Sequence, residues 1–338
     1  MKLLPLEDPR WVEFAESQPQ ATLFHHPAWA RLLADCYGYR AMALALTDRG
    51  GAVTAGLPIM DVSRPLGGRR WVSLPFTDYC PALAGDRAGD LVSGLVEMAR
   101  SARLRLLELR AGLPPHRDMQ AGAAFVRHEL TVSGDPRPTW DQLFKNHRRN
   151  VRIAERAGVR IVRGGSASDF EMFYRLHLQT RRRLGVPIQP RRFFRLLLER
   201  IIQPGLGFVL SAYREDVLLA SAIFGSWNDT LIYKYSARDE RFAKLDANYL
   251  LLWTAIRWAC ENGYHTFDLG RSDTDQVLLR GFKSGWGARE EPLSYSRIAT
   301  SPVGSSSRRL QSAMSMVIRN SNPWVCRVVG ELLYRYAT

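Results

Sequence analysis

The pattern of apolar and polar positions predicts two sets of helices and strands that follow each other in the same order. In the first set, a helix at 29–36 precedes two apolar runs, and the polar turn Asp48–Gly51 between these runs is typical of a hairpin. A short strand at 71–74, a helix at 90–102 and a strand at 104–109 follow. Helices interspersed with mostly antiparallel strands predict an α/β (α+β) fold.

The second half of the chain repeats this order. Its strongest helical pattern covers 248–262, where apolar residues recur at intervals of three and four. The strand that follows, His265–Leu269, is expected to end at Gly270. The other elements predicted here are helices at about 169–184 and 191–202, a hairpin with strands at 208–213 and 217–224, and a strand at 231–236. Two copies of one layout predict a tandem arrangement.

Proline and glycine in the segment Ser133–Pro138 interrupt both neighbouring elements and predict a domain boundary. We expect an N-terminal domain at 1–135, a C-terminal domain at 139–300 and a separate tail at 301–338. From Val325 onward, apolar residues of the tail recur at helical spacing up to residue 336 and predict an amphipathic helix. This helix either packs on the body of the protein or lies on an anionic membrane surface.

A helix with one basic face is predicted directly after the boundary. Thr139–Gln142 has the pattern of a capping box, and Gly158 is a candidate C-cap. Five cations lie at offsets 0, 3, 4, 7 and 11 on this helix: Lys145, Arg148, Arg149, Arg152 and Arg156. Like charges on one face repel each other, so this face is expected to bind anions. Arg149 and Arg152 are candidate ligands for substrate phosphates.

The net charge of +14 is concentrated around this helix. Residues 137–201 contain 16 Lys and Arg against 5 Asp and Glu. This excess indicates a polyanionic partner, which can be a nucleotide-linked or lipid-linked phosphate, RNA or an anionic membrane surface. The alternative is a basic surface that serves only solubility.

Cysteine and histidine spacing predicts no metal site. The four cysteines are isolated, and the chain has neither a CxxC nor an HxxxH pair. We therefore expect reduced thiols in a cytoplasmic protein, with a peripheral contact at the inner face of the membrane as an open alternative. No run of about 18 apolar residues predicts a membrane span, and the N-terminal residues lack the apolar core of a signal peptide.

The segment 266–287, TFDLGRSDTDQVLLRGFKSGWG, carries the most informative motif. An apolar strand is followed by charged residues, among them Arg271 and Asp273, and then by Lys283 in a cluster of glycines and aromatic residues. Polar residues just past the end of an apolar strand are where α/β proteins build ligand sites. The alternative is a solvated loop with a glycine-rich turn.

FDxGRS followed by GFKxGWG resembles the C-terminal signature of the FemABX-like proteins. These are relatives of the GNAT N-acyltransferases and include peptidoglycan-bridge aminoacyltransferases and proteins of exopolysaccharide loci. Further motifs match in the same order up to about residue 301: His26, Pro27 and Trp29; Leu74, Pro75 and Phe76; Asn150, Ala154, Gly158 and Val159; Thr180, Arg183 and Gly185. The resemblance implies two tandem GNAT-like domains, each with a mixed, mostly antiparallel sheet flanked by helices.

The resemblance also implies roles for two cations. In the FemABX enzymes the lysine of this element supports the charged intermediate or the tRNA end, and Lys283 occupies its position. Arg183 occupies the position of an arginine that binds a diphosphate, for which a guanidinium group is well suited. Acyl transfer also needs a base for the amine, and Asp273 or Asp275, beside Arg271, is a candidate.

Aromatic and acidic residues complete the candidate site. Tyr233 and Tyr235 lie two positions apart on one strand, so they are expected to point to the same face, where they bind substrate or close the edge of the core. Asp78 and Tyr79 follow an apolar strand in the first half and are candidates for lining the acceptor site.

The expected function is transfer of an aminoacyl or acyl group to an amine of a phosphate-bearing peptidoglycan or exopolysaccharide precursor. In GNAT proteins that use coenzyme A, a glycine-rich loop holds the pyrophosphate, whereas residues 238–248 here contain no glycine. The donor is therefore aminoacyl-tRNA or acyl-CoA, and no bound cofactor is expected. The competing hypotheses are a coenzyme A-dependent acyltransferase that acts on a sugar or lipid amine, and a non-catalytic scaffold that binds RNA or membrane.

Overall fold

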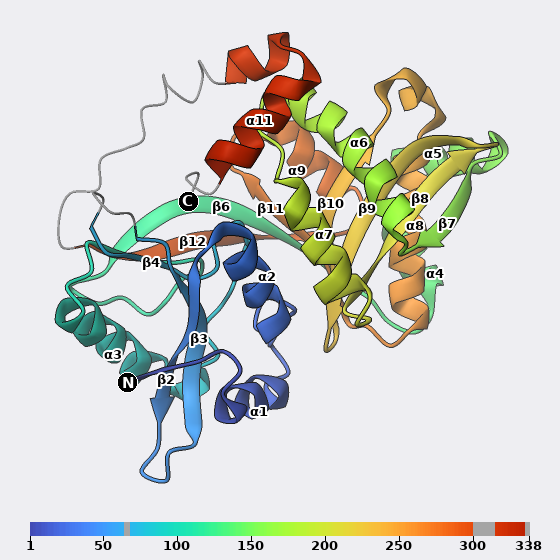
Figure 1. Cartoon of the computed structure of the whole chain (residues 1–338). Helices are drawn as coiled ribbons and strands as arrows, with labels where there is room; N and C mark the ends of the chain where they lie inside the picture. Colours follow the sequence, from blue (N-terminus) through green and yellow to red (C-terminus); the bar gives the residue numbers. More distant parts are fainter. Residues whose placement is uncertain (64–67, 300–314, 335–338) are drawn as a thin grey trace.

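The computed structural model describes residues 1–63, 68–299 and 315–334, and its named strands form one sheet (Figure 1). The strand order is β1-β2-β3-β4-β5-β12-β6-β11-β10-β9-β8-β7, and only the β4–β5 and β10–β11 pairs are parallel among the strands described. The strands are β1 (Lys2–Leu4), β2 (Arg40–Thr47), β3 (Val53–Asp61), β4 (Arg70–Val72), β5 (Leu106–Leu109), β6 (Gln120–Thr131), β7 (Arg160–Gly164), β8 (Gly207–Arg214), β9 (Val217–Trp227), β10 (Thr230–Arg238), β11 (Thr266–Asp273) and β12 (Arg289–Ala299). The predicted mixed, mostly antiparallel α/β fold is confirmed.

Helices cover both faces of this sheet. One face carries α1, α2, α6 and α7, and the other carries α3 in the N-terminal half and α5 and α8 in the C-terminal half. The helices are α1 (Pro9–Ser17), α2 (Pro27–Tyr37), α3 (Ala88–Ser101), α4 (Pro136–Gln142), α5 (Lys145–Arg156), α6 (Ala167–Leu184), α7 (Arg191–Leu197), α8 (Ala247–Glu261), α9 (Val277–Ser284) and α11 (Pro323–Leu333). Each predicted helix of the two repeated sets has a counterpart among them.

Two long strands that the apolar pattern did not predict join the two halves. β6 lies between β12 and β11, and β12 pairs with β5 of the N-terminal half. Both strands run through the middle of the molecule from one half to the other (Figure 1). The last described strand, β12, therefore completes the sheet of the first half, while the boundaries at 135 and 139 stay a prediction.

Next to β6, the parallel strands β10 and β11 pair over a short stretch and then separate. Their pairing covers Thr230–Ile232 and Thr266–Asp268, after which β10 continues with β9 alone. The strand predicted at 265–269 corresponds to β11, and the prediction that it ends at Gly270 was wrong. β11 continues to Asp273 through an irregularity in its pairing with β6. Gly270 has a φ of 70°, a left-handed conformation that glycine adopts without strain.

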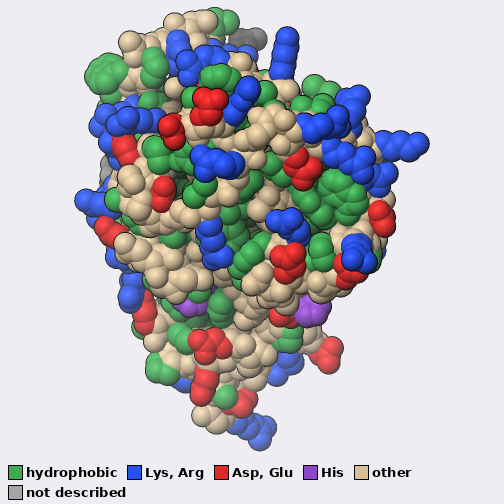
Figure 2. Space-filling model, turned by 90° about the vertical axis from the view of Figure 1, so that its right-hand side faces the viewer, with side chains coloured by type: hydrophobic (Ala, Val, Ile, Leu, Met, Phe, Trp, Pro, Cys, Tyr) green, Lys and Arg blue, Asp and Glu red, His purple; other side chains and the backbone are tan. Residues whose placement is uncertain are grey.

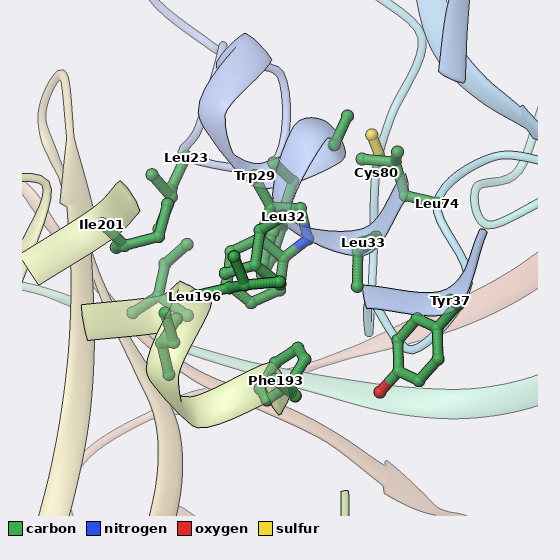
Figure 3. Packing of buried hydrophobic residues seen from close by; sticks show 14 of the residues in the cluster. Leu23, Trp29, Leu32, Leu33, Tyr37, Leu74, Cys80, Phe193, Leu196 and Ile201 are labelled. Carbon is green, nitrogen blue, oxygen red and sulfur yellow. The ribbon is translucent and has the colours of Figure 1, made fainter. Parts of the chain in front are cut away.

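The two halves are held together by a shared apolar core. α2 packs against α7, with Trp29 and Leu33 on one side and Phe193 and Leu196 on the other, all buried (Figure 3). The indole nitrogen of Trp29 donates to Thr77 Oγ1 at 3.0 Å, so its one polar atom is satisfied. A core of this kind fixes the relative position of the halves, and a site between them is preorganised.

The predicted basic helix is in fact the second of two helices. α4 begins at Pro136, because Asp135 accepts from the backbone N–H of Arg137 and is the N-cap. The capping box at Thr139 was therefore wrong: Thr139 is buried inside α4. The chain leaves the helical conformation before Phe144, and α5 then begins at Lys145 without a side-chain cap.

The C-terminal helix α11 packs on the body against α6 (Figure 1). The Cys326 thiol donates to the carbonyl of Val186, and Gly330 lies so close to Ile188 that an added Cβ would be 2.0 Å from the Ile188 carbonyl oxygen. Tyr334 is buried at the end of this helix. Residues 301–314 and 335–338 of the predicted tail lie outside the described residues. No described helix is both long and apolar enough to cross a bilayer.

Candidate active site

Where β10 and β11 separate, a cavity of about 320 Å³ opens in the C-terminal half. Its wall brings together three of the predicted site residues, Arg183, Tyr233 and Lys283. The remaining lining residues are Thr180, Leu184, Ala220, Ser221, Ala222, Ser236, Ala237, Arg238, Asn248, Leu251, Leu279 and Phe282. Small side chains on β9 make room at one wall, and charged groups at the other can orient a ligand.

Lys283, on α9, forms hydrogen bonds with the backbone of β11 beyond the last residue that pairs with β10. Its Nζ donates to the carbonyls of Gly270 at 3.0 Å and of Arg271 at 2.7 Å, both on β11 beyond the point of separation. The side chain is only 6% exposed, and this burial lowers the pKa to about 8, although the carboxylates of Asp78 and Asp268 favour the charged form.

Both protonation states of Lys283 are thus chemically useful. The ammonium has one more N–H, which can stabilise negative charge in the cavity, and the neutral amine has a lone pair, which can accept a proton. Because the pKa is about 8, both forms are populated near neutral to mildly basic pH.

Arg183, at the mouth of the cavity, is already paired. Its guanidinium lies 2.8 Å from the carboxylate of Glu240, which also accepts two hydrogen bonds from Arg238 at 3.0 and 3.1 Å. The Arg183 side chain is 49% exposed, so a phosphate can approach it. A phosphate bound there would share or displace Glu240.

Tyr233 and Tyr235 do not point to the same face, and that prediction was wrong. The pairing of β10 with β9 shifts between these residues, so Lys234 is an extra residue in β10. The bulge breaks the alternation of side chains. Tyr233 lies in the cavity wall, whereas Tyr235 packs at 5.8 Å from Phe193 on the opposite face, in the core between the halves.

A second polar cluster lies where the two halves meet, around Asp78. The Asp78 carboxylate is 3.1 Å from Lys234 Nζ and 3.7 Å from Arg271 Nε, and its side chain is 32% exposed. Burial favours the neutral acid, but the cations of Lys234 and Arg271 outweigh it and lower the pKa of Asp78. Arg271 donates to Tyr295 Oη, which donates to the Asp78 carbonyl at 2.7 Å. The predicted residues Asp78 and Arg271 are thus brought together.

The cavity and the Asp78 cluster share the bulge of β11. Lys283 bonds the Gly270 carbonyl, and a Cβ at Gly270 would lie 3.4 Å from Asp78 Oδ2. Tyr79, next to Asp78, stacks under the guanidinium of Arg127 at 4.5 Å. The two sites therefore meet across one short stretch of backbone.

Other predicted residues lie elsewhere. Asp273 and Asp275 are exposed and do not line the cavity. Arg149 and Arg152 are exposed on α5, where neither forms an ion pair with a described residue. Burial raises the pKa of Asp246, at the start of α8, and the positive charges of Arg149 and of Arg238 in the cavity wall oppose this shift. α5 therefore lies beside the cavity.

Several site residues were missed at the sequence level. Asp268 is buried, and its pKa is raised by that burial; its carboxylate accepts from the Gly270 N–H at 2.6 Å. It belongs to the FDxGRS motif, so a signal was present. His128 lies 3.1 Å from Ser272 Oγ, and Tyr295 binds Asp78; both come from strands that the apolar pattern did not predict. In the described part of the chain, no group of three or more His, Cys, Asp or Glu residues can hold a metal ion.

Comparison with known proteins agrees with this arrangement. Residues 142–284 match a family described as "Acetyltransferase (GNAT) domain". The chain is 22% identical, over 82% of its length and 89% of the relative, to a UDP-N-acetylmuramoylpentapeptide-lysine N(6)-alanyltransferase of Weissella viridescens.

Two solved structures show the same fold at low sequence identity. The crystal structure of FemX has a TM-score of 0.70 at 14% identity and covers 93% of this chain and 100% of its own. The C-terminal domain of a putative lysylphosphatidylglycerol synthetase from Agrobacterium fabrum has a TM-score of 0.56 at 15% identity, with coverages of 91% and 95%. Together with the motifs, these findings show a GNAT acyltransferase domain at 142–284 in a chain that is similar to FemABX-like proteins over most of its length.

Proposed function

We propose that this acyltransferase moves an aminoacyl group from aminoacyl-tRNA to a primary amine of a phosphate-bearing cell-envelope precursor. The observation that carries the proposal is the meeting of the cavity with the Asp78 cluster at the bulge of β11, bridged by Lys283. The name of the alanyltransferase relative supports an acceptor of the muramoyl-peptide type.

In the proposed reaction, the acceptor nitrogen attacks the acyl carbonyl carbon. A C–N bond forms, the ester C–O bond to the terminal ribose breaks, the amine gives up a proton and the ribose oxygen leaves as a hydroxyl after gaining one. Asp78 is ionised and attracts the acceptor ammonium, and neutral Lys283 takes its first proton, so that the free amine can attack. The second proton leaves the nitrogen as the amide forms and passes to the departing ribose oxygen. In its charged form, Lys283 stabilises the oxyanion.

Arg183 is proposed to hold the phosphates of the acceptor. Its exposed guanidinium stands at the mouth of the cavity, and two parallel hydrogen bonds to phosphate oxygens suit its geometry. Asp273, expected as a base from the sequence, is exposed away from the cavity, so Lys283 is the better candidate for that role.

Coenzyme A fits the donor side less well. The segment before α8 has no glycine, and the carboxylate of Asp246 stands at the start of this helix, where a pyrophosphate would otherwise find free backbone N–H groups. A carboxylate at this position repels an anion.

The proposal is tested with purified protein, UDP-N-acetylmuramoylpentapeptide as the acceptor, and either pooled aminoacyl-tRNA or acyl-CoA as the donor. Mass spectrometry is expected to detect an aminoacylated acceptor only with charged tRNA, and much less of it with Lys283→Ala. Thiol release and an acylated product from acyl-CoA alone would support the coenzyme A alternative. Absence of transfer from every donor, with Lys283→Ala functional in cells, would support the scaffold alternative.

A further inference from the structure

The exposed face of α5 is a straight row of cations. Lys145, Arg149, Arg152 and Arg156 are all exposed, and none forms an ion pair with a described residue. At a rise of about 1.5 Å per residue, they span roughly 16 Å along the helix axis. Figure 2 shows the side of the molecule on which α5 lies, and Lys and Arg side chains are more numerous in the upper part of this view.

The buried face of the same helix fixes this row in place. Val151 and Ala154 are fully buried against α8, and His147 Nε2 lies 2.9 Å from the carbonyl of Phe282, a residue of the cavity wall. Arg148 does not belong to the row, because its guanidinium turns back to the carbonyl of Asp141 at 2.7 Å. The exposed cations are therefore presented by a rigid support.

An exposed aromatic side chain stands at the end of the row near the cavity. Phe144 is 54% exposed, and its backbone N–H donates to the carbonyl of Gly285 at 3.0 Å. Gly285 follows α9, which carries Phe282 and Lys283 of the cavity wall. Within 140–158, no other large apolar side chain is exposed.

We propose that this face binds the phosphate backbone of an RNA, with Phe144 stacking on a base of its unpaired 3′ end at the entrance to the cavity. The inference rests on the proposed function, in which an RNA ester is the donor. A row of exposed cations fits a chain with repeated phosphates, and an exposed aromatic side chain at its end is an arrangement with which proteins hold unpaired nucleotides.

Other anions fit this face less well. A single diphosphate engages one or two cations, whereas this row presents four over roughly 16 Å. A helix that lies on a membrane buries an apolar stripe along its length, but the inner stripe of α5 is already buried in the protein and its outer face is polar.

The test uses the whole protein and an uncharged RNA, so that binding is measured independently of acyl transfer. Fluorescence anisotropy compares a short hairpin with an unpaired 3′ extension and the same hairpin with a blunt end. Arg149→Gln/Arg152→Gln is expected to weaken binding of both hairpins by at least tenfold and to reduce the slope of log K against log salt by about 1.5. The charge-matched control, Arg49→Gln/Arg103→Gln, changes exposed arginines of the N-terminal half and is expected to bind as wild type.

Phe144→Ala is expected to weaken binding of the extended hairpin by about tenfold and to leave the blunt hairpin unaffected. Phe144→Trp, which retains a stacking surface, is expected to restore binding. If Phe144→Ala weakens binding of the two hairpins equally, or if Arg149→Gln/Arg152→Gln binds RNA as wild type, the inference is refuted even if acyl transfer from tRNA is observed. Binding to phosphatidylglycerol vesicles that depends on these arginines, without RNA binding, would also overturn it in favour of a membrane surface.

Discussion

Lys283 offers the sharpest test, because the structure assigns it a hydrogen-bonding role that is measurable without any substrate. Lys283→Ala removes the donors that satisfy the carbonyls of Gly270 and Arg271 where β10 has left β11. An unpaired buried polar group costs about 1–3 kcal/mol, and two carbonyls therefore cost about 2–6 kcal/mol. Water entering from the cavity can satisfy part of this demand, so we expect a loss near the lower end of that range.

The assay is urea unfolding followed by tryptophan fluorescence, since Trp286 is fully buried close to the site. The matched control is Leu279→Ala, which alters a half-exposed residue of the same cavity wall and is expected to cost less than about 1 kcal/mol. If Lys283→Ala is as stable as Leu279→Ala, the two carbonyls do not depend on the lysine.

The pH dependence gives an independent check with a definite sign. The pKa of Lys283 is lowered from 10.5 to about 8 in the folded chain, so between these pH values the unfolded chain binds more protons than the folded one. Stability should therefore rise with pH over this window, by about 3 kcal/mol for a complete change of protonation. Lys283→Met should lack this rise. A wild-type protein with the same pH dependence as Lys283→Met would refute the lowered pKa.

Other substitutions test the remaining parts of the site and fold. Arg183→Ala should raise the KM for a phosphate-bearing acceptor by about 10- to 100-fold, as for a lost charged hydrogen bond, and an unchanged KM in steady-state kinetics would remove its phosphate role. Tyr235→Ala should lower the free energy of unfolding by about 3–5 kcal/mol, because the ring is part of the core between the halves; a small loss in urea unfolding would contradict that position. The pKa of Asp78 is lowered in the folded chain, so its carboxylate stabilises the wild type above the ordinary pKa of 3.8, and this stabilisation is lost as the pH falls below that value. Asp78→Asn should therefore be less stable than wild type near neutral pH, and the free energies of unfolding of the two proteins should converge in acid unfolding. Gly330→Ala should detach α11, because the added Cβ would meet the Ile188 carbonyl, and limited proteolysis of the C-terminal segment should accelerate.

The strands that were predicted from the sequence are those whose own residues specify them. β2 and β3 are apolar runs joined by a tight turn, and β8 and β9 repeat this arrangement. β6 has many partly exposed positions, and β12 contains a proline and several charged residues, so neither has a strong local pattern. These two strands form because each finds neighbours on both sides in the finished sheet. Long-range pairing of this kind leaves little trace in a short window of sequence.

The candidate site was predicted in part for the same reason. The motif around Lys283 pointed to a cation near the end of a strand, but its carbonyl partners depend on a split between two strands and a bulge at Gly270. Tyr233 and Tyr235 were expected on one face because strands alternate, and the one-residue bulge at Lys234 reversed that relation. Glu240, which pairs with Arg183, is far from it in sequence, so no local pattern links the two residues.

The two bulges explain why the site needs both halves of the chain. The bulge in β10 directs Tyr233 to the cavity and lets Lys234 reach Asp78, a residue of the N-terminal half. The bulge in β11 brings the Gly270 backbone between Asp78 and Lys283. A reacting group held in the cavity and an acceptor amine held by Asp78 would then be separated by one strand end. Closing either bulge by deleting a residue should therefore uncouple the two sites.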